Sequence, residues 1–402
     1  MSLQLENRNL YRLPWTLPDN AISWLEPTAQ CNLACDGCYR KNEINSHKTM
    51  EVVREELDVF QKYRNSDCIS IAGGDPLLYP DILELVSEIK SRGIKPIINT
   101  NGMALTMDLL KDLKKAGVFG FTFHVDSKQG RGGDWKNKSE IELNKLRSHY
   151  ADMLYEVGGI ACSFNMTIYE DNLDSVPGVL EWAEKNIDRV QSVVFIAFRY
   201  IIPSMKMDWY AGNEKVDWDE IMYHSEFDRN VNLNSTDVLE KARTKYPDLE
   251  PCAFLNGTLK ADSYKWLLAE RIGTTKNIYG YGGSKFMEMV MTFHHLFNGT
   301  YLSYGTPKMA KMARSAMLFL WPFDKGVRKA LKNMMKNPFR IFKSSYFQTV
   351  LFIQPVDFME NGEQSMCDGC PDITVHKGEL VWSCRLEEPM RYGQFLRSVP
   401  KN

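Results

Sequence analysis

The sequence lacks the features that mark exported or membrane-spanning chains. Its first residues, MSLQLENRNLYRLPW, hold no basic stretch followed by an apolar core. No uninterrupted apolar run approaches the roughly 20 residues that cross a bilayer, and there is no low-complexity tract. We therefore expect a cytoplasmic chain that is neither secreted nor threaded through a membrane.

An excess of charge of one sign is also missing. The chain has 49 Lys and Arg against 51 Asp and Glu, a formal net charge of −2. This balance excludes a global attraction to nucleic acid or membrane, so any such contact must be local. The 402 residues are 44% hydrophobic, enough to bury a core larger than one average domain needs.

Short β-rich runs alternate with helical patterns between Ile22 and Tyr200. This alternation predicts an α/β fold with repeated βα units around a parallel sheet, and six units in under 200 residues predict a partial (β/α)6 TIM-like barrel. Functional residues of such barrels lie in the loops that follow the strands. The expected strands are residues 22–27, 67–72, 95–100, 119–126, 159–168 and 192–200.

We expect four segments along the chain. Residues 1–21 form an N-terminal extension, and residues 22–200 form the partial barrel. Residues 201–353 are rich in Met, aromatic and basic residues without a clear strand rhythm, which predicts a mostly helical insertion. Residues 354–402 form a small C-terminal subdomain whose cysteines bind a metal.

A first cysteine group, Cys31, Cys35 and Cys38, follows the first strand in a CxxxCxxC pattern. In a chain that is not exported, such spacing indicates metal ligands rather than disulfides. Three thiolates on one loop can hold three irons of a four-iron cluster and leave the fourth iron open. A zinc knuckle that lacks its fourth ligand, or a chance spacing, is the alternative.

This pattern, followed directly by Tyr39, resembles the radical S-adenosylmethionine (radical SAM) superfamily. The resemblance implies an enzyme in which Cys31, Cys35 and Cys38 hold a [4Fe–4S] cluster and the open iron binds S-adenosylmethionine. Reduction by a donor such as flavodoxin or ferredoxin would cleave this cofactor to a 5′-deoxyadenosyl radical, which abstracts hydrogen from an unactivated C–H bond. Tyr39 would lie near the adenine.

Loops after later strands resemble other motifs of the family. The GGDP sequence after the second strand stands where the family has GGEP, and its carboxylate would accept a hydrogen bond from the cofactor's ammonium group. The arginine on the sixth strand would meet the cofactor's carboxylate. An ordinary strand-end turn or a polar barrel interior is the alternative. The residues implied to contact the cofactor are Gly73, Gly74, Asp75, Pro76, Asn101, Ser163, Asn165 and Arg199.

The fourth strand ends in the sequence His124-Val-Asp126-Ser127, where relatives often carry an S-x-D type sequence. His124 and Asp126 are the candidate catalytic residues. A single histidine in such a run is more often structural, so a packing role is the alternative.

A second cysteine group near the C-terminus comprises Cys367, Cys370 and Cys384. A tight pair with a distant third cysteine is typical of a metal site, with a small hairpin around residues 375–382 between them. Cys252 is the predicted fourth ligand. The group resembles auxiliary-cluster extensions of the family, which implies a second [4Fe–4S] cluster, while structural zinc or unmetallated cysteines are the alternatives.

Residues 306–346 hold ten Lys or Arg against one acid, Asp324. Basic residues between Lys325 and Lys336 share one helical face, and apolar residues, Val327 and Met334 among them, occupy another. This pattern is typical of a helix that lies on an anionic membrane surface, and it would make the protein peripheral on the inner face of the membrane. A solvated helix that buries its apolar stripe in the same chain is the alternative. We expect no nucleic-acid partner.

Three functions follow from these patterns. The first is a radical SAM enzyme that acts on a membrane lipid or another long apolar substrate, and the sequence has a weaker resemblance to enzymes that crosslink lipid tails. The second is a peptide- or protein-modifying radical SAM enzyme with an auxiliary cluster. The third is a non-catalytic iron–sulfur or zinc scaffold at a membrane surface.

Overall fold

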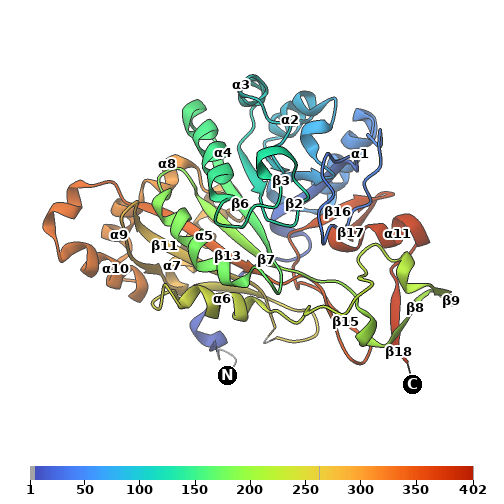
Figure 1. The fold of residues 1–402 in the computed structure, drawn as a ribbon. Helices are drawn as coiled ribbons and strands as arrows, with labels where there is room; N and C mark the ends of the chain where they lie inside the picture. Colours follow the sequence, from blue (N-terminus) through green and yellow to red (C-terminus); the bar gives the residue numbers. More distant parts are fainter. Residues whose placement is uncertain (1–4, 262, 402) are drawn as a thin grey trace.

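The computed structural model describes residues 5–261 and 263–401 and is built on an 11-stranded sheet (Figure 1). Six of its strands are parallel and lie side by side in chain order. They are β2 (Asp19–Thr28), β3 (Asn65–Gly73), β4 (Lys95–Thr100), β5 (Gly120–His124), β6 (Ala161–Ile168) and β7 (Ser192–Ala197). The predicted α/β fold with six βα strands is confirmed.

Five helices connect these strands and cover the outer face of the sheet. Each buries one apolar stripe against the strands, for example Leu57, Val86 and Leu180, which are fully buried in one cluster. The N-terminus of the first helix is capped by Thr49, whose side chain accepts a hydrogen bond from the amide of Val52. The helices are α1 (Met50–Tyr63), α2 (Ile82–Ser91), α3 (Met107–Ala116), α4 (Asn144–Val157) and α5 (Val176–Lys185).

The predicted helical insertion also contributes strands to the main sheet, which the sequence analysis did not anticipate. β13 (Tyr346–Ile353) pairs in parallel with β7, and β11 (Tyr264–Thr274) runs antiparallel to β13. Residues 201–353 are therefore continuous with the barrel rather than a separate insertion. The sheet is completed by β1 (Tyr11–Arg12), β10 (Ala253–Asn256) and β12 (Asn277–Gly282), and α6 (Ser235–Arg243) packs beside it.

A helical lobe formed by α7–α10 and a short 3-10 helix lies at one end of the view in Figure 1. The amphipathic helix predicted for membrane contact is α10, but its apolar residues Val327, Ala330 and Met334 are buried against the chain's own β-strands and α9. Its apolar stripe is therefore used internally. The elements are α7 (Ser284–Asn298), α8 (Pro307–Ala310), α9 (Ala313–Leu320), α10 (Lys325–Met335) and η7 (Pro338–Phe342).

The C-terminal segment lies at the other end of that view. Its hairpin of β16 (Ile373–His376) and β17 (Glu379–Trp382) confirms the predicted hairpin between the late cysteines. The remaining elements are β14 (Asp357–Phe358), β15 (Gln364–Ser365), α11 (Glu387–Tyr392) and β18 (Arg397–Pro400). β18 pairs with β8 (Met207–Ala211), which in turn pairs with β9 (Glu214–Val216). Within the described residues, no helix has the length and apolarity needed to cross a membrane.

Candidate functional site

One cavity of about 860 Å³ opens inside the curved sheet. Side chains from the inner face of β2 to β7, β11 and β13 line it, together with residues of α7 to α9. Both cysteine groups contribute to its wall. They come from opposite ends of the sequence, Cys31, Cys35 and Cys38 from the loop after β2, and Cys367, Cys370 and Cys384 from the C-terminal segment.

The first cysteine loop follows β2, the first strand of the parallel set, as predicted. Burial raises the pKa of the Cys35 thiol, and the nearby negative charges of Asp126, Cys38 and Cys31 raise it further. Thiolates that repel one another are stabilised when a bound metal neutralises their negative charge, and metal binding displaces the thiol protons. This donor set therefore fits a positively charged iron core.

Two glycines bring the backbone after β3 close to this loop. Gly73 has a φ of +102°, and a Cβ there would stand 2.4 Å from the carbonyl oxygen of Thr28. A Cβ on Gly74 would stand 2.2 Å from the carbonyl oxygen of Gln30. Both positions therefore require glycine to keep the loop before Cys31 in place.

Substitution of Gly73 by Ala is expected to displace this loop. The positive φ costs about 1–3 kcal/mol for a residue with a side chain, and the clash with the Thr28 carbonyl adds to that. We expect a lower unfolding midpoint and less iron retained per chain after anaerobic reconstitution. Gly93, also at positive φ but with nothing within 4 Å of its Cβ position, provides the control, since Gly93→Ala should change stability without changing iron content.

Asp75 ties two loops together. Its carboxylate accepts hydrogen bonds from Thr100 Oγ1 (2.9 and 2.8 Å), the Asn101 amide (2.9 Å) and the Leu77 amide (3.0 Å). These bonds occupy the carboxylate that the sequence analysis assigned to the cofactor's ammonium group. The neighbouring Asn101 donates through Nδ2 to Asn32 Oδ1 (2.7 Å) and lies 3.7 Å from Cys31 Sγ, so it contacts the cysteine loop directly.

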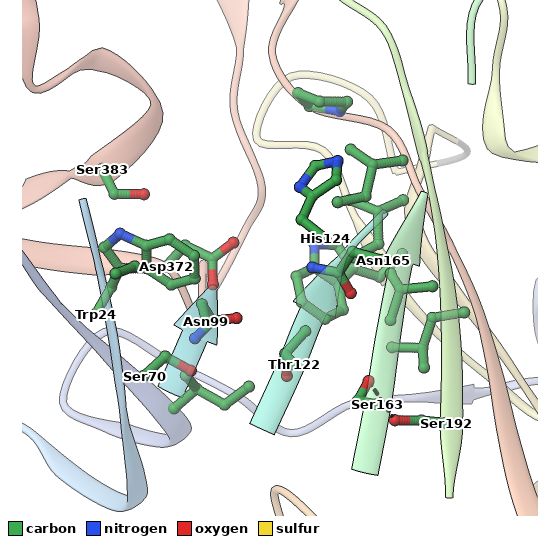
Figure 2. A pocket seen from close by; sticks show the side chains of 18 of the residues that line it. Trp24, Ser70, Asn99, Thr122, His124, Ser163, Asn165, Ser192, Asp372 and Ser383 are labelled. Atoms are coloured by element: carbon green, nitrogen blue, oxygen red, sulfur yellow. Dashed lines mark hydrogen bonds between the residues drawn. The ribbon is translucent and has the colours of Figure 1, made fainter. Parts of the chain in front are cut away.

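His124 and Asp126 are brought together at the end of β5. His124 Nε2 lies 2.9 Å from Asp126 Oδ2 and 3.0 Å from Thr167 Oγ1. Burial opposes the charged form of Asp126, but its hydrogen bonds with His124 and with backbone amides outweigh burial and lower its pKa. Figure 2 shows His124 and Asn165 on neighbouring strands, with their side chains in the cavity.

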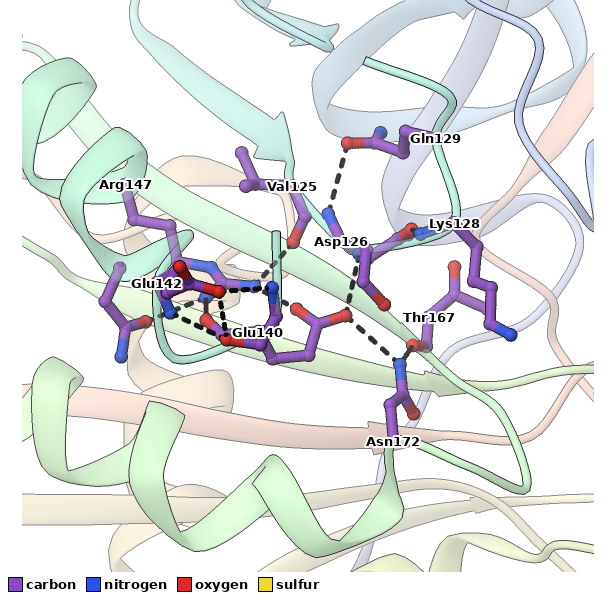
Figure 3. Close-up of polar contacts among 12 residues, drawn as sticks. Val125, Asp126, Lys128, Gln129, Glu140, Glu142, Arg147, Thr167 and Asn172 are labelled. Carbon is purple, nitrogen blue, oxygen red and sulfur yellow. Dashed lines mark hydrogen bonds and ion pairs between the residues drawn. The ribbon is translucent and has the colours of Figure 1, made fainter. Parts of the chain in front are cut away.

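A buried ion pair holds the loop behind His124 (Figure 3). Arg147 of α4 and Glu140 are 2.7 Å apart and almost fully buried. Glu140 Oε1 accepts a hydrogen bond from the Ser127 amide (2.7 Å), and Arg147 donates to the carbonyl of Val125 (2.7 Å). The pair therefore fixes the backbone on both sides of Asp126.

The second cysteine group lies close to the first. The hydrogen bond with Cys367 and then burial raise the pKa of Cys370, and burial raises the pKa of Cys384 to about 12. Tyr39 also lines the cavity, and burial, together with the negative charges of Asp372 and Cys384, raises the pKa of its hydroxyl. Its predicted contact with adenine stays a prediction.

Cys252 is not a member of this group, contrary to the prediction. Its side chain is fully buried in an apolar cluster with Leu13 and Trp266, and its Sγ donates to the carbonyl of Leu268. It does not line the cavity that holds the other three cysteines. The loop that looked irregular in the sequence leads into β10, which places Cys252 inside the protein core. Asp372, two residues after Cys370, faces the cavity instead.

Two arginines that the sequence analysis missed join the cysteine groups to the barrel. Arg40 pairs with Glu26 of β2 (2.5 Å), and its guanidinium also donates to the carbonyl of Ser383, next to Cys384. Arg64 donates to the carbonyls of Cys370 (2.8 Å) and Ile22 (2.9 Å). Only the adjacency of Arg40 to the first cysteine loop could have pointed to this role from sequence.

Arg199 lines the cavity and is paired within the protein, and its predicted contact with the cofactor stays a prediction. Its guanidinium donates to Asp357 Oδ1 (3.2 Å), the Phe198 carbonyl (2.9 Å) and Asn234 Oδ1 (3.3 Å). A buried guanidinium needs a counter-charge, and Asp357 supplies it. Of the other predicted residues, Ser163 accepts a hydrogen bond from Ser192 Oγ (2.7 Å), and Pro76 begins a 3-10 helix after β3.

No three His, Cys, Asp or Glu side chains of residues 5–261 and 263–401 are grouped as ligands of one single metal ion. A four-iron cluster places its three thiolates on three different irons, which sets them further apart than ligands of one ion. The three thiols of each group open to one cavity and fit that requirement in donor type and number.

Comparison with known proteins finds a family match for the part of the chain that holds the six parallel strands. Residues 25–183 match the model of the radical SAM superfamily. The match confirms the predicted resemblance and, with it, S-adenosylmethionine and a [4Fe–4S] cluster as the cofactors of this domain.

Curated relatives match over part of their length. The chain is 33% identical over 106 residues to the tungsten-containing aldehyde ferredoxin oxidoreductase cofactor-modifying protein of Pyrococcus furiosus, covering 26% of this chain and 30% of the relative. It is 27% identical over 185 residues to the PqqA peptide cyclase of Xanthomonas campestris pv. campestris, covering 43% and 47%. The chain thus spans about a third to a half of the length of these relatives.

Among solved structures, Streptococcus suis SuiB is 15% identical, with a TM-score of 0.41 over 58% of this chain and 47% of that chain. Methylornithine synthase (PylB) is 16% identical, with a TM-score of 0.36 over 56% and 64%.

Proposed function

Because the chain carries a radical SAM domain over residues 25–183, we propose that it is an enzyme that abstracts hydrogen from an unactivated C–H bond of a membrane lipid. The observation that carries the proposal is that both cysteine groups and an apolar wall line one shared cavity. That arrangement would enclose a long apolar substrate beside the radical chemistry and exclude water from it.

Different residues of the chain would bind the cluster, admit the cofactor and exchange a proton. Cys31, Cys35 and Cys38 would hold the cluster, which on reduction supplies the electron that cleaves S-adenosylmethionine and so provides the hydrogen-abstracting radical. Gly73 and Gly74 would allow the cofactor to approach the backbone closely. His124, held by Asp126, would keep one ring nitrogen available to exchange a proton with the substrate.

A second cluster would be held by Cys367, Cys370 and Cys384, with one iron open unless Asp372 ligates it. Its position on the wall of the same cavity suits an electron relay or a direct contact with substrate. Zinc in this place would leave a structural role only.

The apolar wall supports a hydrocarbon substrate. Met287 and Met291 of α7 are buried and line the cavity. The lining continues with Met309 of α8, Met312 between α8 and α9, and Leu320 of α9. Methionine adapts its shape to featureless apolar chains. Met309 and Met312 are also 37% and 53% exposed, so the cavity wall reaches the surface at these helices.

The surface around this exit supports a membrane contact. Large apolar side chains are exposed on α9, the turn after it and η7, with Phe319 73%, Phe339 77% and Phe342 81% accessible. Exposed apolar groups of this size mark an interaction site. Eight basic side chains of the same lobe are exposed, namely Lys308, Lys311, Lys325, Arg328, Lys329, Lys332, Lys336 and Lys343. Exposed apolar side chains beside positive charges suit binding to an anionic bilayer.

Charge reversal on this lobe is expected to weaken vesicle binding. Each basic residue near an anionic surface contributes about 1 kcal/mol, so Lys332→Glu with Lys336→Glu should lower the bound fraction at least tenfold. Flotation with vesicles of phosphatidylcholine and phosphatidylglycerol (3:1) measures this. The control, Lys62→Glu with Lys111→Glu on exposed positions of α1 and α3, should float like the wild type. Equal flotation of both variants would rule out this lobe as the membrane contact.

Isotope transfer tests the substrate. Anaerobically reconstituted protein with dithionite and S-adenosylmethionine is mixed with vesicles whose lipids carry perdeuterated acyl chains. We expect deuterium in the 5′-deoxyadenosine that forms. Unlabelled 5′-deoxyadenosine would exclude the acyl chain as the site of abstraction, and its absence from fully loaded protein would favour the scaffold function.

A second candidate is peptide modification. It is supported by the 27% identity to the PqqA peptide cyclase of Xanthomonas campestris pv. campestris. Stimulation of 5′-deoxyadenosine formation by a peptide substrate, and not by lipid vesicles, would favour this candidate over the first.

A further inference from the structure

A row of polar side chains crosses the inner face of the sheet. The strand register pairs Asn99 with Thr122, Thr122 with Ser163, Ser163 with Ser192, Ser192 with Thr349, and Thr349 with Glu270. Six adjacent strands, β4, β5, β6, β7, β13 and β11, thus each place one hydrogen-bonding side chain at the same level of the cavity wall. Figure 2 shows the first four of them. The row lies two residues before His124 on β5.

This row retains hydrogen-bonding capacity that the protein does not use. Ser192 Oγ donates to Ser163 Oγ and Thr349 Oγ1 donates to Glu270 Oε2, both at 2.7 Å. In the described part of the chain, however, the amide nitrogen of Asn99 has no partner, nor has Nε2 of Gln191, a cavity-lining residue that is 8% exposed. Buried amides without partners are unfavourable, which indicates that a ligand group meets them.

The charges around the row limit what that group can be. Among the described residues that line the cavity, the guanidinium groups are those of Arg40 and Arg199, and both are paired with carboxylates. A phosphate or carboxylate would therefore meet no unpaired guanidinium and would face Glu270. Burial raises the pKa of Glu270 to about 7, so near neutral pH this side chain is partly a neutral donor.

We infer that the row binds an uncharged, hydroxyl-bearing part of the substrate, such as a glycerol or sugar unit. Hydroxyls both donate and accept, so they satisfy the serines, Asn99 and Gln191 together. Met287 and Met291 then contact the apolar part of the same amphipathic molecule. The inference rests on the proposed function, because the group occupies the cavity assigned there to the substrate.

Four probes with one alkyl chain test this inference. Octyl glucoside, octyl phosphate, octylamine and octanol, each below its micellar concentration, are titrated calorimetrically into reconstituted protein without S-adenosylmethionine. We expect octyl glucoside to bind at least tenfold more tightly than octyl phosphate and octylamine, because a site built to bond hydroxyls discriminates strongly by polar pairing. Tightest binding of octylamine or of octyl phosphate, or equal binding of all four, would overturn it.

Variants of the row add an independent readout. Ser192→Ala with Thr349→Val should lower the affinity for octyl glucoside about tenfold and leave that for octyl phosphate unchanged. Ser87→Ala on the exposed face of α2 is the control. A wild-type protein that forms 5′-deoxyadenosine but binds octyl glucoside no more tightly than octyl phosphate overturns only the subsite. Intact selectivity without 5′-deoxyadenosine formation overturns only the proposed function.

Discussion

Replacing any one of Cys31, Cys35 and Cys38 by Ala is expected to abolish 5′-deoxyadenosine formation. Three thiolates are the minimum that holds a four-iron cluster with one iron open, so the loss of one releases the cluster. Iron should fall from about eight to about four per chain, as expected for two four-iron clusters reduced to one. Chromatography of the nucleoside and iron analysis of the same sample measure both effects.

The control for these variants is Cys162→Ala. Cys162 is fully buried in the apolar cluster beneath the helices and does not line the cavity, so its loss should leave iron and activity unchanged. Cys252→Ala should behave in the same way, because that thiol is fully buried, donates to the Leu268 carbonyl and does not line the cavity. Full activity in Cys38→Ala would contradict the proposed function, and loss of iron in Cys252→Ala would contradict the position of Cys252.

Arg147→Ala is expected to lower the free energy of unfolding by about 3–5 kcal/mol. The substitution leaves the carboxylate of Glu140 buried without its counter-charge, and removal of one partner of a buried pair has this effect. The carbonyls of Val125 and Glu140 also lose their donor. Anaerobic denaturant unfolding of the reconstituted protein measures the change.

The matched control is Arg189→Ala, which removes a partly exposed pair with Asp152. Pairs of that kind contribute about 0–1 kcal/mol, so the expected change is much smaller. Glu140 also accepts a hydrogen bond from the Ser127 amide. The folded fraction of the Arg147→Ala protein should therefore form 5′-deoxyadenosine at an altered rate, because the loop after His124 is displaced. Equal effects of the two substitutions would mean that the buried pair is not what secures this loop.

The strands of the barrel were predictable because their signals are local. Apolar runs alternate with helical periods from β2 to β7, and all six strands overlap the predicted ranges. β11 was missed because Lys265, Glu270 and Arg271 interrupt its apolar run. The structure shows why the strand tolerates them, since Lys265 pairs with Asp357 (2.6 Å) and Arg271 packs over Tyr246.

Two of the predicted site residues have internal partners that the sequence did not indicate. Arg199 was assigned to the cofactor, and the structure adds an ion pair with Asp357, 158 residues later. Cys252 was assigned to the second cysteine group, but it directly precedes β10, and its Sγ donates to the carbonyl of Leu268 on the neighbouring strand β11. In both cases the deciding partner is remote in sequence, so no local pattern could have indicated it.

The sequence by itself determined the features in which spacing along one loop sets the chemistry. Three thiols within eight residues can reach one cluster whatever the rest of the chain does, and the radical SAM match follows from that loop and its strands. Only the tertiary structure decided what surrounds the cluster. The strand register aligns the polar row. The path of the C-terminal segment brings Cys367, Cys370 and Cys384 to the same cavity as the first cysteine group. Packing buries the apolar stripe of α10 and leaves Phe339 and Phe342 exposed. These features depend on contacts between distant segments, whose free energies no local periodicity encodes.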